Sequence, residues 1–328
     1  MNSEPMSTTQ ELPRDAKIYV AGHRGLVGGA ILRRLNADGF TNIVTRTSSE
    51  LDLRDQNAAN AFFEAEKPDF VILAAARVGG ILANATYPAQ FIYDNLMIAA
   101  NTIEAAHRSG VKKLLNLGSS CIYPKMAPQP LQENALLTGP LEETNRAYAI
   151  AKIAAIELCD SYRIQYGSDF ISAMPTNLYG PFDNFDLQGS HVLPALMRKM
   201  HDANLHNAST VEIWGSGTPK REFLHCDDLA DACLFLLENY SQPGPINVGS
   251  GTDLTIQELA HLIQEVVGFE GELAFDAAKP DGTPRKLMDV SKLQHAGWKA
   301  KIGLREGIKT TYQWFLENVE TLPERAHV

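Results

Sequence analysis

A short strand pattern that runs directly into a glycine-rich turn and then a helix pattern constrains this chain most. Residues 17–21 (KIYVA) are a short, mainly apolar run, glycines follow at Gly22, Gly25 and Gly28, and a helix pattern covers 26–36. In this setting the first glycine permits a tight turn, the second lets backbone approach a pyrophosphate, and the third lets helix and strand pack closely. The pattern predicts a dinucleotide-binding unit, with GxxGxxG spacing in place of GxGxxG.

Strand and helix patterns then alternate along the first half of the chain. Strands are expected at 42–46, 69–76, 113–117 and 169–174, and helices at 56–66, 88–109 and 145–166. This alternation predicts an α/β fold with a doubly wound parallel sheet of the Rossmann type. Ligands of such sheets bind beyond the carboxyl ends of the strands, and Gly22, Ala76, Ser119 and Asn177 are expected at such ends.

Composition and charge exclude several classes of partner. The formal net charge of the 328 residues is −10, which argues against nucleic acid and anionic membranes as partners. No apolar run approaches the roughly 20 residues of a membrane span. The polar start is read as a disordered tail over 1–14 without a signal peptide. The four cysteines lack metal-site spacing, so we expect free thiols, a cytoplasmic location and no metal.

A tyrosine and a lysine one helical turn apart suggest acid–base chemistry. Tyr148 and Lys152 share one face of the expected helix 145–166. A free phenol has a pKa near ~10, and a neighbouring ammonium favours its ionised form, so Lys152 is expected to lower the pKa of Tyr148. The hydroxyl of Ser119 can bind the carbonyl oxygen that the tyrosine protonates. The same spacing also occurs on helices where the tyrosine only packs at the core edge, so the pair alone does not decide.

The second expected strand indicates which dinucleotide binds. An NAD site usually places a carboxylate here for the ribose hydroxyl, whereas an NADP site uses arginine. This chain has Arg46 and no acid before Glu50, and Arg24 lies within the glycine turn. NADP is therefore favoured, with solvated surface arginines as the alternative.

These motifs resemble those of the extended short-chain dehydrogenases/reductases, and the likeness covers the chain from about Lys17 onward. Within that family, five longer segments are similar to those of epimerase-reductases that act on a GDP-4-keto-6-deoxy sugar: residues 22–25, 118–124, 175–181, 214–225 and 280–286. One departure is Ser48, which stands where a second basic residue is expected, so the 2′-phosphate would rest mainly on Arg24 and Arg46.

The resemblance implies NADPH as cofactor and a GDP-sugar as substrate. Cys121 and His191 would be an acid–base pair for epimerisation at C3 and C5, and Ser119, Tyr148 and Lys152 would serve the reduction at C4. The implied substrate contacts are Lys199, Trp214, Arg221, Asp281 and Lys286. The implied cofactor contacts are Gly22, His23, Arg24, Gly25, Leu26, Val27, Gly28, Arg46, Asp52, Leu53, Ala75, Asn95, Leu117, Gly118, Ser119, Ser120, Lys152, Pro175, Thr176, Asn177, Leu178 and His191.

For three of these residues a structural alternative stays open. Cys121 could be a buried thiol, His191 a residue that only starts a helix, and Trp214 a core side chain. Other functions on the same scaffold are a plain NAD-dependent epimerase or 4-reductase, a GDP-colitose-type synthase, and a non-catalytic NADP sensor.

The domain division expected from the resemblance has a Rossmann domain over 15–180 and 222–250. A smaller, interleaved substrate domain covers 181–221 and 251–328. The helices 88–109 and 145–166 carry apolar residues on more than one face and, in this family, pair across a two-fold axis, so a homodimer is expected.

Overall fold

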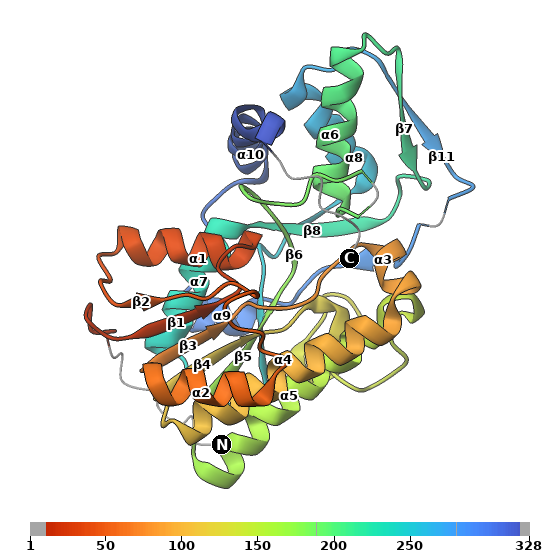
Figure 1. The fold of residues 1–328 in the computed structure, drawn as a ribbon. Coiled ribbons are helices and arrows are strands. Elements are labelled where there is room, and N and C mark those ends of the chain that lie inside the picture. Colours follow the sequence, from red (N-terminus) through yellow and green to blue (C-terminus); the bar gives the residue numbers. More distant parts are fainter. Residues whose placement is uncertain (1–10, 188, 280, 322–328) are drawn as a thin grey trace.

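The computed structural model describes residues 11–187, 189–279 and 281–321. A six-stranded parallel sheet in the order β2-β1-β3-β4-β5-β9 is the central element (Figure 1). The α/β doubly wound fold predicted from the sequence is thereby confirmed. Its strands are β1 (Ile18–Ala21), β2 (Ile43–Val44), β3 (Phe70–Leu73), β4 (Lys113–Leu117), β5 (Asp169–Pro175) and β9 (Pro245–Val248).

Helices cover both faces of this sheet: α1 and α7 pack on one face, and α2, α4 and α5 pack on the other (Figure 1). They are α1 (Leu26–Ala37), α2 (Gln56–Glu66), α4 (Pro88–Arg108), α5 (Arg146–Tyr166) and α7 (Cys226–Asn239). Strand β1 explains the two layers. Its four residues are all buried, and because side chains alternate along a strand, Ile18 and Val20 pack in the α1/α7 cluster while Tyr19 and Ala21 pack in the α2/α4/α5 cluster.

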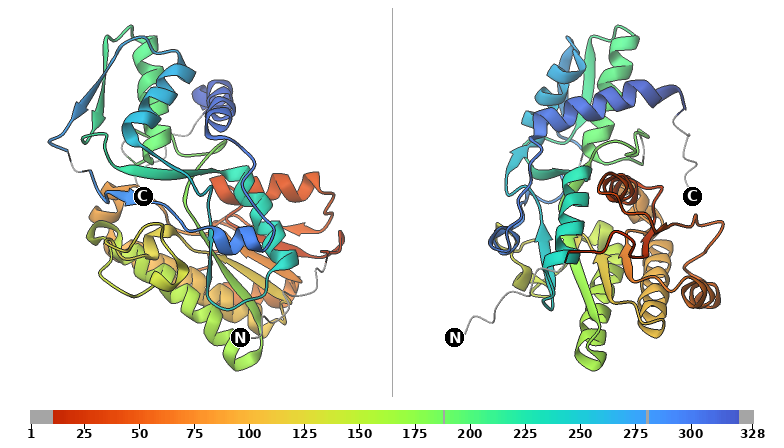
Figure 2. Two further views of the ribbon diagram at one scale, coloured as in Figure 1. Left: turned by 180° about the vertical axis from the view of Figure 1, so that it is seen from behind. Right: turned by 90° about the vertical axis from the view of Figure 1, so that its left-hand side faces the viewer.

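A second lobe stands above the carboxyl ends of the strands (Figures 1 and 2). Its core is formed by apolar side chains of three helices, α6 (Val192–Leu205), α8 (Ile256–Val267) and α10 (Leu304–Asn318). A parallel strand pair, β7 (Thr210–Trp214) with β11 (Glu272–Asp276), packs on them.

Strand β8 (Lys220–His225) lies between the two lobes. It pairs with β6 (Asn177–Tyr179), β10 (Asp253–Thr255) and β12 (Arg285–Lys286). The remaining short elements are α3 (Ile81–Thr86), α9 (Ser291–His295), η1 (Ser120–Ile122), η2 (Glu133–Ala135), η3 (Glu143–Asn145) and η4 (Val319–Thr321). None of the helices among the described residues is long and apolar enough to cross a membrane.

Three expectations about local structure need correction. The expected tail over 1–14 extends too far, because Leu12 is buried in the core and Arg14 stacks on Phe40 at 4.5 Å; residues 1–10 lie outside the described part. The strand expected over 42–46 is only Ile43–Val44. The strand expected over 69–76 ends at Leu73, because the chain then leaves the sheet where the glycine turn packs against it.

Candidate active site

The glycine turn after β1 has the form of a phosphate-binding cradle. Gly22 has φ +85°, and a Cβ there would lie 2.7 Å from the amide nitrogen of Ala75. A Cβ on Gly28 would collide with the carbonyl oxygen of Gly22. Gly25 caps α1 without any side-chain hydrogen bond, so the N–H groups of the first turn are available to an anion.

His23, in the same turn, has a buried Nδ1 atom without a hydrogen-bond partner. Burial lowers the pKa of this imidazole, and the charge of Arg24 lowers it further. A buried polar atom without a partner is costly, so it indicates a ligand that supplies the missing bond. The residues of the turn therefore fit the pyrophosphate of a dinucleotide.

The two arginines expected at the 2′-phosphate differ in their surroundings. Arg24 is exposed at the glycine turn. The Arg46 guanidinium already pairs with Glu66 at 2.6 Å and lies over the ring of Phe62. Glu50 lies close enough for both arginines to lower its pKa, although hydrogen bonds from Thr47 are the larger cause. Arg24 is thus the more available of the two.

Two other expected cofactor residues are held by the protein itself. Asn95 in α4 is buried; its amide donates to the carbonyls of Phe91 and Arg77, and its oxygen accepts from the Arg77 amide. It thereby fixes the segment that follows β3 and contains Ala75. The carboxylate of Asp52 is paired with Arg54 at 2.8 Å, and the next residue, Leu53, is buried.

Several expected site residues lie at the carboxyl ends of β4 and β5. The Thr176 hydroxyl and the Asn177 amide both donate to the backbone carbonyl of Glu222 in β8, which joins the central sheet to the second lobe. The other expected residues here are Leu117, which ends β4, then Gly118, Ser119 and Ser120 after it, Pro175, which ends β5, and Leu178 in β6.

Ser119, Tyr148 and Lys152 come together as expected from their spacing. The Ser119 hydroxyl lies close enough to the Tyr148 phenol to lower its pKa. The Lys152 ammonium lies 5.8 Å from the Tyr148 ring centroid and donates to the carbonyl of Leu117 at 2.8 Å. The tyrosine is half-buried, with the ring of Phe91 edge-on to it. A carbonyl placed at Ser119 and Tyr148 would have both hydroxyls within reach.

The expectation that Lys152 lowers the pKa of Tyr148 is not met in this structure. Burial raises the pKa of the phenol and the charge of Cys121 raises it further, against the hydrogen bond from Ser119. Burial also lowers the pKa of Lys152 to about 8. Desolvation disfavours both charged forms, and it is the largest cause of both shifts.

Cys121 is half-buried two residues beyond Ser119, and its sulfur lies close to two donors. Asn145 Nδ2 is 3.3 Å from Sγ, and Lys286 Nζ is 3.5 Å from it. The other three cysteines are fully buried, as a purely structural thiol would be, whereas Cys121 is not.

His191 is the N-cap of α6, yet its side chain makes no capping hydrogen bond. The residue keeps access to solvent, but protein atoms packed around the ring lower the pKa of the imidazole, and the charge of Lys286 lowers it further. Lys286 is thus near both Cys121 and His191, so this part of the chain brings together two acid–base groups and a cation.

Sequence reasoning missed Asn145. It was considered only as the start of a helix, but its amide contacts Cys121. The sequence spacing could have indicated it, because a residue three positions before Tyr148 lies on the same side of the helix as the tyrosine.

The expected substrate residues Lys199, Trp214, Arg221 and Asp281 lie in the second lobe and along β8. Trp214 is 58% exposed, which excludes a core-packing role. Lys199 and Lys279 both place their ammonium groups 5.4 Å from its ring centroid, and Lys279 was also missed from the sequence. Such an exposed ring between two cations can stack on a base and hold an anion.

Asp281 and Arg221 meet in the same region. The Asp281 carboxylate accepts from the amide (2.7 Å) and hydroxyl (2.8 Å) of Ser216, and Arg221 donates to the Asp281 carbonyl at 3.4 Å. Burial lowers the pKa of Arg221, opposed by the charges of Asp281 and Cys121. Lys286 pairs with Arg221 in the β8–β12 register, so the two cations are neighbours.

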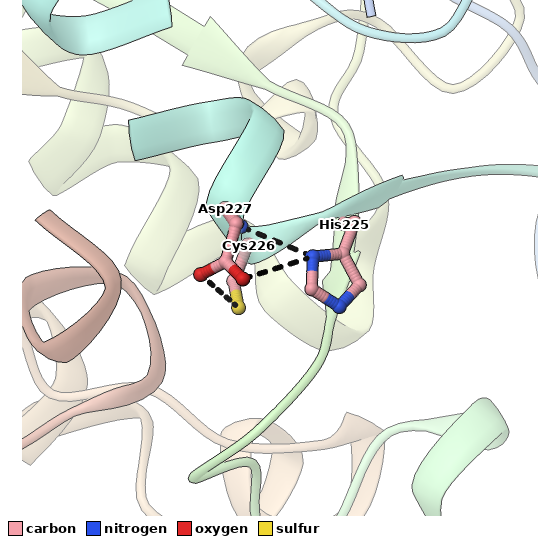
Figure 3. A group of neighbouring side chains, drawn as sticks. All are labelled: His225, Cys226 and Asp227. Atoms are coloured by element: carbon pink, nitrogen blue, oxygen red, sulfur yellow. Dashed lines mark hydrogen bonds and ion pairs between the residues drawn. The ribbon is translucent and has the colours of Figure 1, made fainter. Parts of the chain in front are cut away.

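One group of described residues has metal-ligand chemistry: His225, Cys226 and Asp227 at the start of α7 (Figure 3). His225 Nδ1 already accepts the Asp227 amide as a helix cap, and Arg33 pairs with the Asp227 carboxylate at 2.6 Å and contacts the Cys226 sulfur. A guanidinium in that position competes with a metal cation, so the group is better described as a capped helix start held by Arg33.

Comparison with known proteins gives one matching family model, described as the NAD dependent epimerase/dehydratase family, over residues 18–249. The chain is 62% identical to "GDP-L-fucose synthase 1" of Arabidopsis thaliana, with 93% of this chain and 95% of that protein covered. It is 57% identical to "GDP-L-fucose synthase" of Escherichia coli K12, with 92% and 97% covered.

More distant relatives extend these comparisons. The chain is 41% identical to "GDP-L-colitose synthase" of Yersinia pseudotuberculosis, with 92% of this chain and 98% of that protein covered. Among solved structures, a GDP-L-fucose synthetase from Naegleria fowleri bound to NADP has a TM-score of 0.89 at 32% identity, with 97% and 99% covered.

Proposed function

The chain belongs to the NAD dependent epimerase/dehydratase family, and from this premise we propose that its site converts GDP-4-keto-6-deoxy-D-mannose to GDP-L-fucose. The reaction is an epimerisation at C3 and C5 followed by NADPH-dependent reduction of the 4-keto group. The observation that carries this function is the surroundings of Cys121. It lies beside Ser119 and Tyr148, and Lys286, which contacts its sulfur, also acts electrostatically on His191. One carbonyl can therefore be served by two acid–base systems.

The epimerase half uses the acidity that a 4-keto group gives to the hydrogens on C3 and C5. A base removes the proton and leaves an enolate, and an acid returns a proton to the opposite face. Cys121 and His191 supply these two groups in our proposal. A thiol (pKa ~8.5) and an imidazole (pKa ~6.5) bracket neutral pH as free groups, so proton traffic is possible in both directions.

The reductase half uses Ser119, Tyr148 and Lys152. NADPH supplies the hydride for C4 when it is bound. Ser119 and Tyr148 hold the carbonyl oxygen, and the phenol gives its proton to the alkoxide that forms. The Lys152 ammonium donates to the Leu117 carbonyl and is thereby held beside the tyrosine. In our proposal it returns a proton to the tyrosine after the transfer and contacts the cofactor.

The cofactor is held by the glycine turn, in which a Cβ on Gly22 or Gly28 would collide with backbone atoms. Arg24 is the principal cation for the 2′-phosphate, with Arg46 beside it. Asp52, Leu53, Ala75, Asn95 and the residues after β4 and β5 complete the site. The GDP end of the substrate is assigned to Lys199, Trp214, Arg221 and Asp281.

The domain division, assembly and location are part of this proposal. The Rossmann domain takes 15–180 and 222–250, and the interleaved substrate domain takes 181–221 and 251–328. Two copies pair through the outer faces of α4 and α5 as a cytoplasmic homodimer. The exposed apolar side chains of Tyr93, Ile150 and Ile164 on these two helices support the pairing.

The nearest alternative is a GDP-colitose-type synthase, which would share the epimerase chemistry. The lower identity to the Yersinia colitose synthase makes it the less favoured of the two. A plain epimerase or 4-reductase would have no use for the second acid–base pair, Cys121 with His191. A non-catalytic sensor would have no use for Ser119, Tyr148 and Lys152 in contact.

Solvent exchange tests the epimerase half directly. The protein is incubated with GDP-4-keto-6-deoxy-D-mannose in D₂O without NADPH, and deuterium at C3 and C5 is measured by NMR. We expect uptake at both carbons in wild type and at neither in Cys121→Ser. Wild type that takes up no deuterium would remove epimerisation from the proposed function.

A further inference from the structure

Lys286 was expected at the GDP moiety, but its ammonium lies at the sulfur of Cys121. The distance from Nζ to Sγ is 3.5 Å, and a second donor, Asn145 Nδ2, lies 3.3 Å from the same sulfur. Lys199 and Lys279, in contrast, lie over Trp214. The lysines of the expected substrate region therefore divide into two groups, one at the exposed Trp214 and one at Cys121.

The position of Lys286 is fixed by its strand. β12 pairs with β8 so that Lys286 is opposite Arg221. The amide of Leu287 donates to Gln129 Oε1 at 2.9 Å, and the amide of Met288 donates to the buried carboxylate of Glu222 at 2.9 Å. The backbone on the far side of Lys286 is thus anchored at two successive residues, and its side chain reaches Cys121 from a defined strand position.

Among the described residues, none forms an ion pair with Lys286. Glu142 is close enough for Lys286 to lower its pKa, but that carboxylate is paired with Lys125 at 2.8 Å, the larger cause. The charge of Cys121 also acts on Tyr148 from α5 and on Arg221 from β8, so Arg221 is a second cation near the sulfur. Lys125, Glu142 and Arg285 line the same pocket as Cys121 and Lys286.

We propose that Lys286 is a positioning residue of the epimerase step, whose ammonium, together with the Asn145 amide, holds Cys121 as a thiolate aimed at the substrate. This inference rests on the proposed function. A sulfur that accepts from two donors, one of them cationic, is favoured in its anionic form. The thiolate can then take the proton from C3 or C5: the C–H bond breaks, an S–H bond forms, and the electron pair enters the enolate.

The test measures the thiolate without the reaction. Wild type, Lys286→Met and Lys286→Arg are treated with iodoacetamide at pH 7, and alkylation of the Cys121 peptide is followed by mass spectrometry. The other three cysteines are buried and serve as an internal check of folding. We expect Lys286→Met to slow alkylation about tenfold, since a neighbouring cation shifts such an equilibrium by at least that factor, and Lys286→Arg to restore most of the rate.

Lys199→Met is the matched control, because it removes a lysine at Trp214 without contact with the sulfur. It should raise KM for the GDP-sugar and leave Cys121 alkylation within about twofold of wild type. Lys286→Met should instead lower kcat for deuterium exchange at C3 and C5 about tenfold. Should Lys286→Met not fold, Lys286→Gln replaces it in both measurements.

Two results would overturn the inference: unchanged Cys121 alkylation in Lys286→Met, or a change in KM alone that matches Lys199→Met. The second result would mean that Lys286 binds the GDP moiety of the substrate. Absence of deuterium exchange in wild type would instead count against the proposed function, and the alkylation rates would still decide whether Lys286 acts on Cys121.

Discussion

At the scale of single residues, the proposed function assigns two sets of proton-transfer groups to one expected carbonyl position. In the proposed function Tyr148, beside Ser119, serves the reduction, and Cys121, two residues from Ser119, serves the epimerisation. Because the two sets use different side chains, single substitutions should separate the two half-reactions.

Replacing Tyr148 with phenylalanine should remove the reduction and spare the epimerisation. The phenylalanine keeps the packing against Phe91 but cannot protonate the C4 oxygen. We expect the rate of NADPH oxidation to fall by about 10² to 10⁴. Deuterium exchange at C3 and C5 without NADPH should persist. Turnover close to that of wild type would show that the proton comes from another group.

The buried ammonium of Lys152 should make stability depend on pH. Its pKa is about 8 in the folded protein and 10.5 as a free group, so between these values the unfolded chain binds more protons than the folded one. The free energy of unfolding therefore rises with pH across that window, by up to about 1.4 kcal/mol per pH unit.

Lys152→Met lacks this titration, so urea unfolding at several pH values isolates it. Wild type should gain stability relative to the variant between pH 8 and pH 10, with little relative change between pH 6 and pH 7. A difference that stays constant with pH would mean that Lys152 is charged in the folded protein across the whole window.

At the scale of elements, the turn between β1 and α1 decides whether the cofactor can bind. Gly28→Ala would drive a methyl group into the Gly22 carbonyl, and the turn would have to open. We expect NADPH affinity, measured by fluorescence titration, to fall at least about tenfold, since phosphate binding depends on the backbone amides of this turn.

Gly29→Ala is the control for that substitution, one residue further along the same helix. Its Cβ would meet the His23 carbonyl oxygen at 3.5 Å, an ordinary contact. NADPH affinity should stay as in wild type, and the helix should gain up to about 1 kcal/mol from alanine. Equal NADPH affinity in the Gly28 and Gly29 variants would contradict the role of the glycine turn in phosphate binding.

Elements with local sequence signals were predictable, and long-range pairings were not. The patterns of α2 and β4 gave their bounds directly, and the glycine turn and the Tyr148–Lys152 spacing are set within a few residues. β12 is only two residues long and exists because β8 lies beside it. No local pattern could place Lys286 at a cysteine 165 positions earlier.

The sequence also did not show which charged residues would form ion pairs. Arg46 was predicted at the cofactor from its position after β2, but nothing local showed that Glu66, at the end of α2, would reach it. The direction of the Tyr148 pKa was missed for a related reason. The spacing shows that a lysine is near, whereas the desolvation of both groups depends on how the whole site packs.

At the scale of the whole molecule, strand β8 links the second lobe to the central sheet. β8 contributes Arg221 to the substrate region and, through the Glu222 carbonyl, is bonded to the residues that follow β5. One strand therefore joins the cofactor and substrate regions. The relative position of the two regions depends on how the two lobes pack.

The outer stripe of α5 predicts assembly. Ile150 and Ile164 are exposed on this helix, and Tyr93 is exposed on the neighbouring α4. Sedimentation velocity at micromolar concentration should give a dimer for wild type and a monomer for Ile150→Glu, because a charge at an apolar helix interface is costly to desolvate. A wild-type monomer at that concentration would refute the pairing.

The central claim is that one site both inverts C3 and C5 and reduces C4. Product analysis by NMR, after incubation with GDP-4-keto-6-deoxy-D-mannose and NADPH, tests it most directly. The account predicts GDP-L-fucose, with one NADPH oxidised for each molecule formed. A reduced GDP-sugar that keeps the original configuration at C3 and C5 would contradict it.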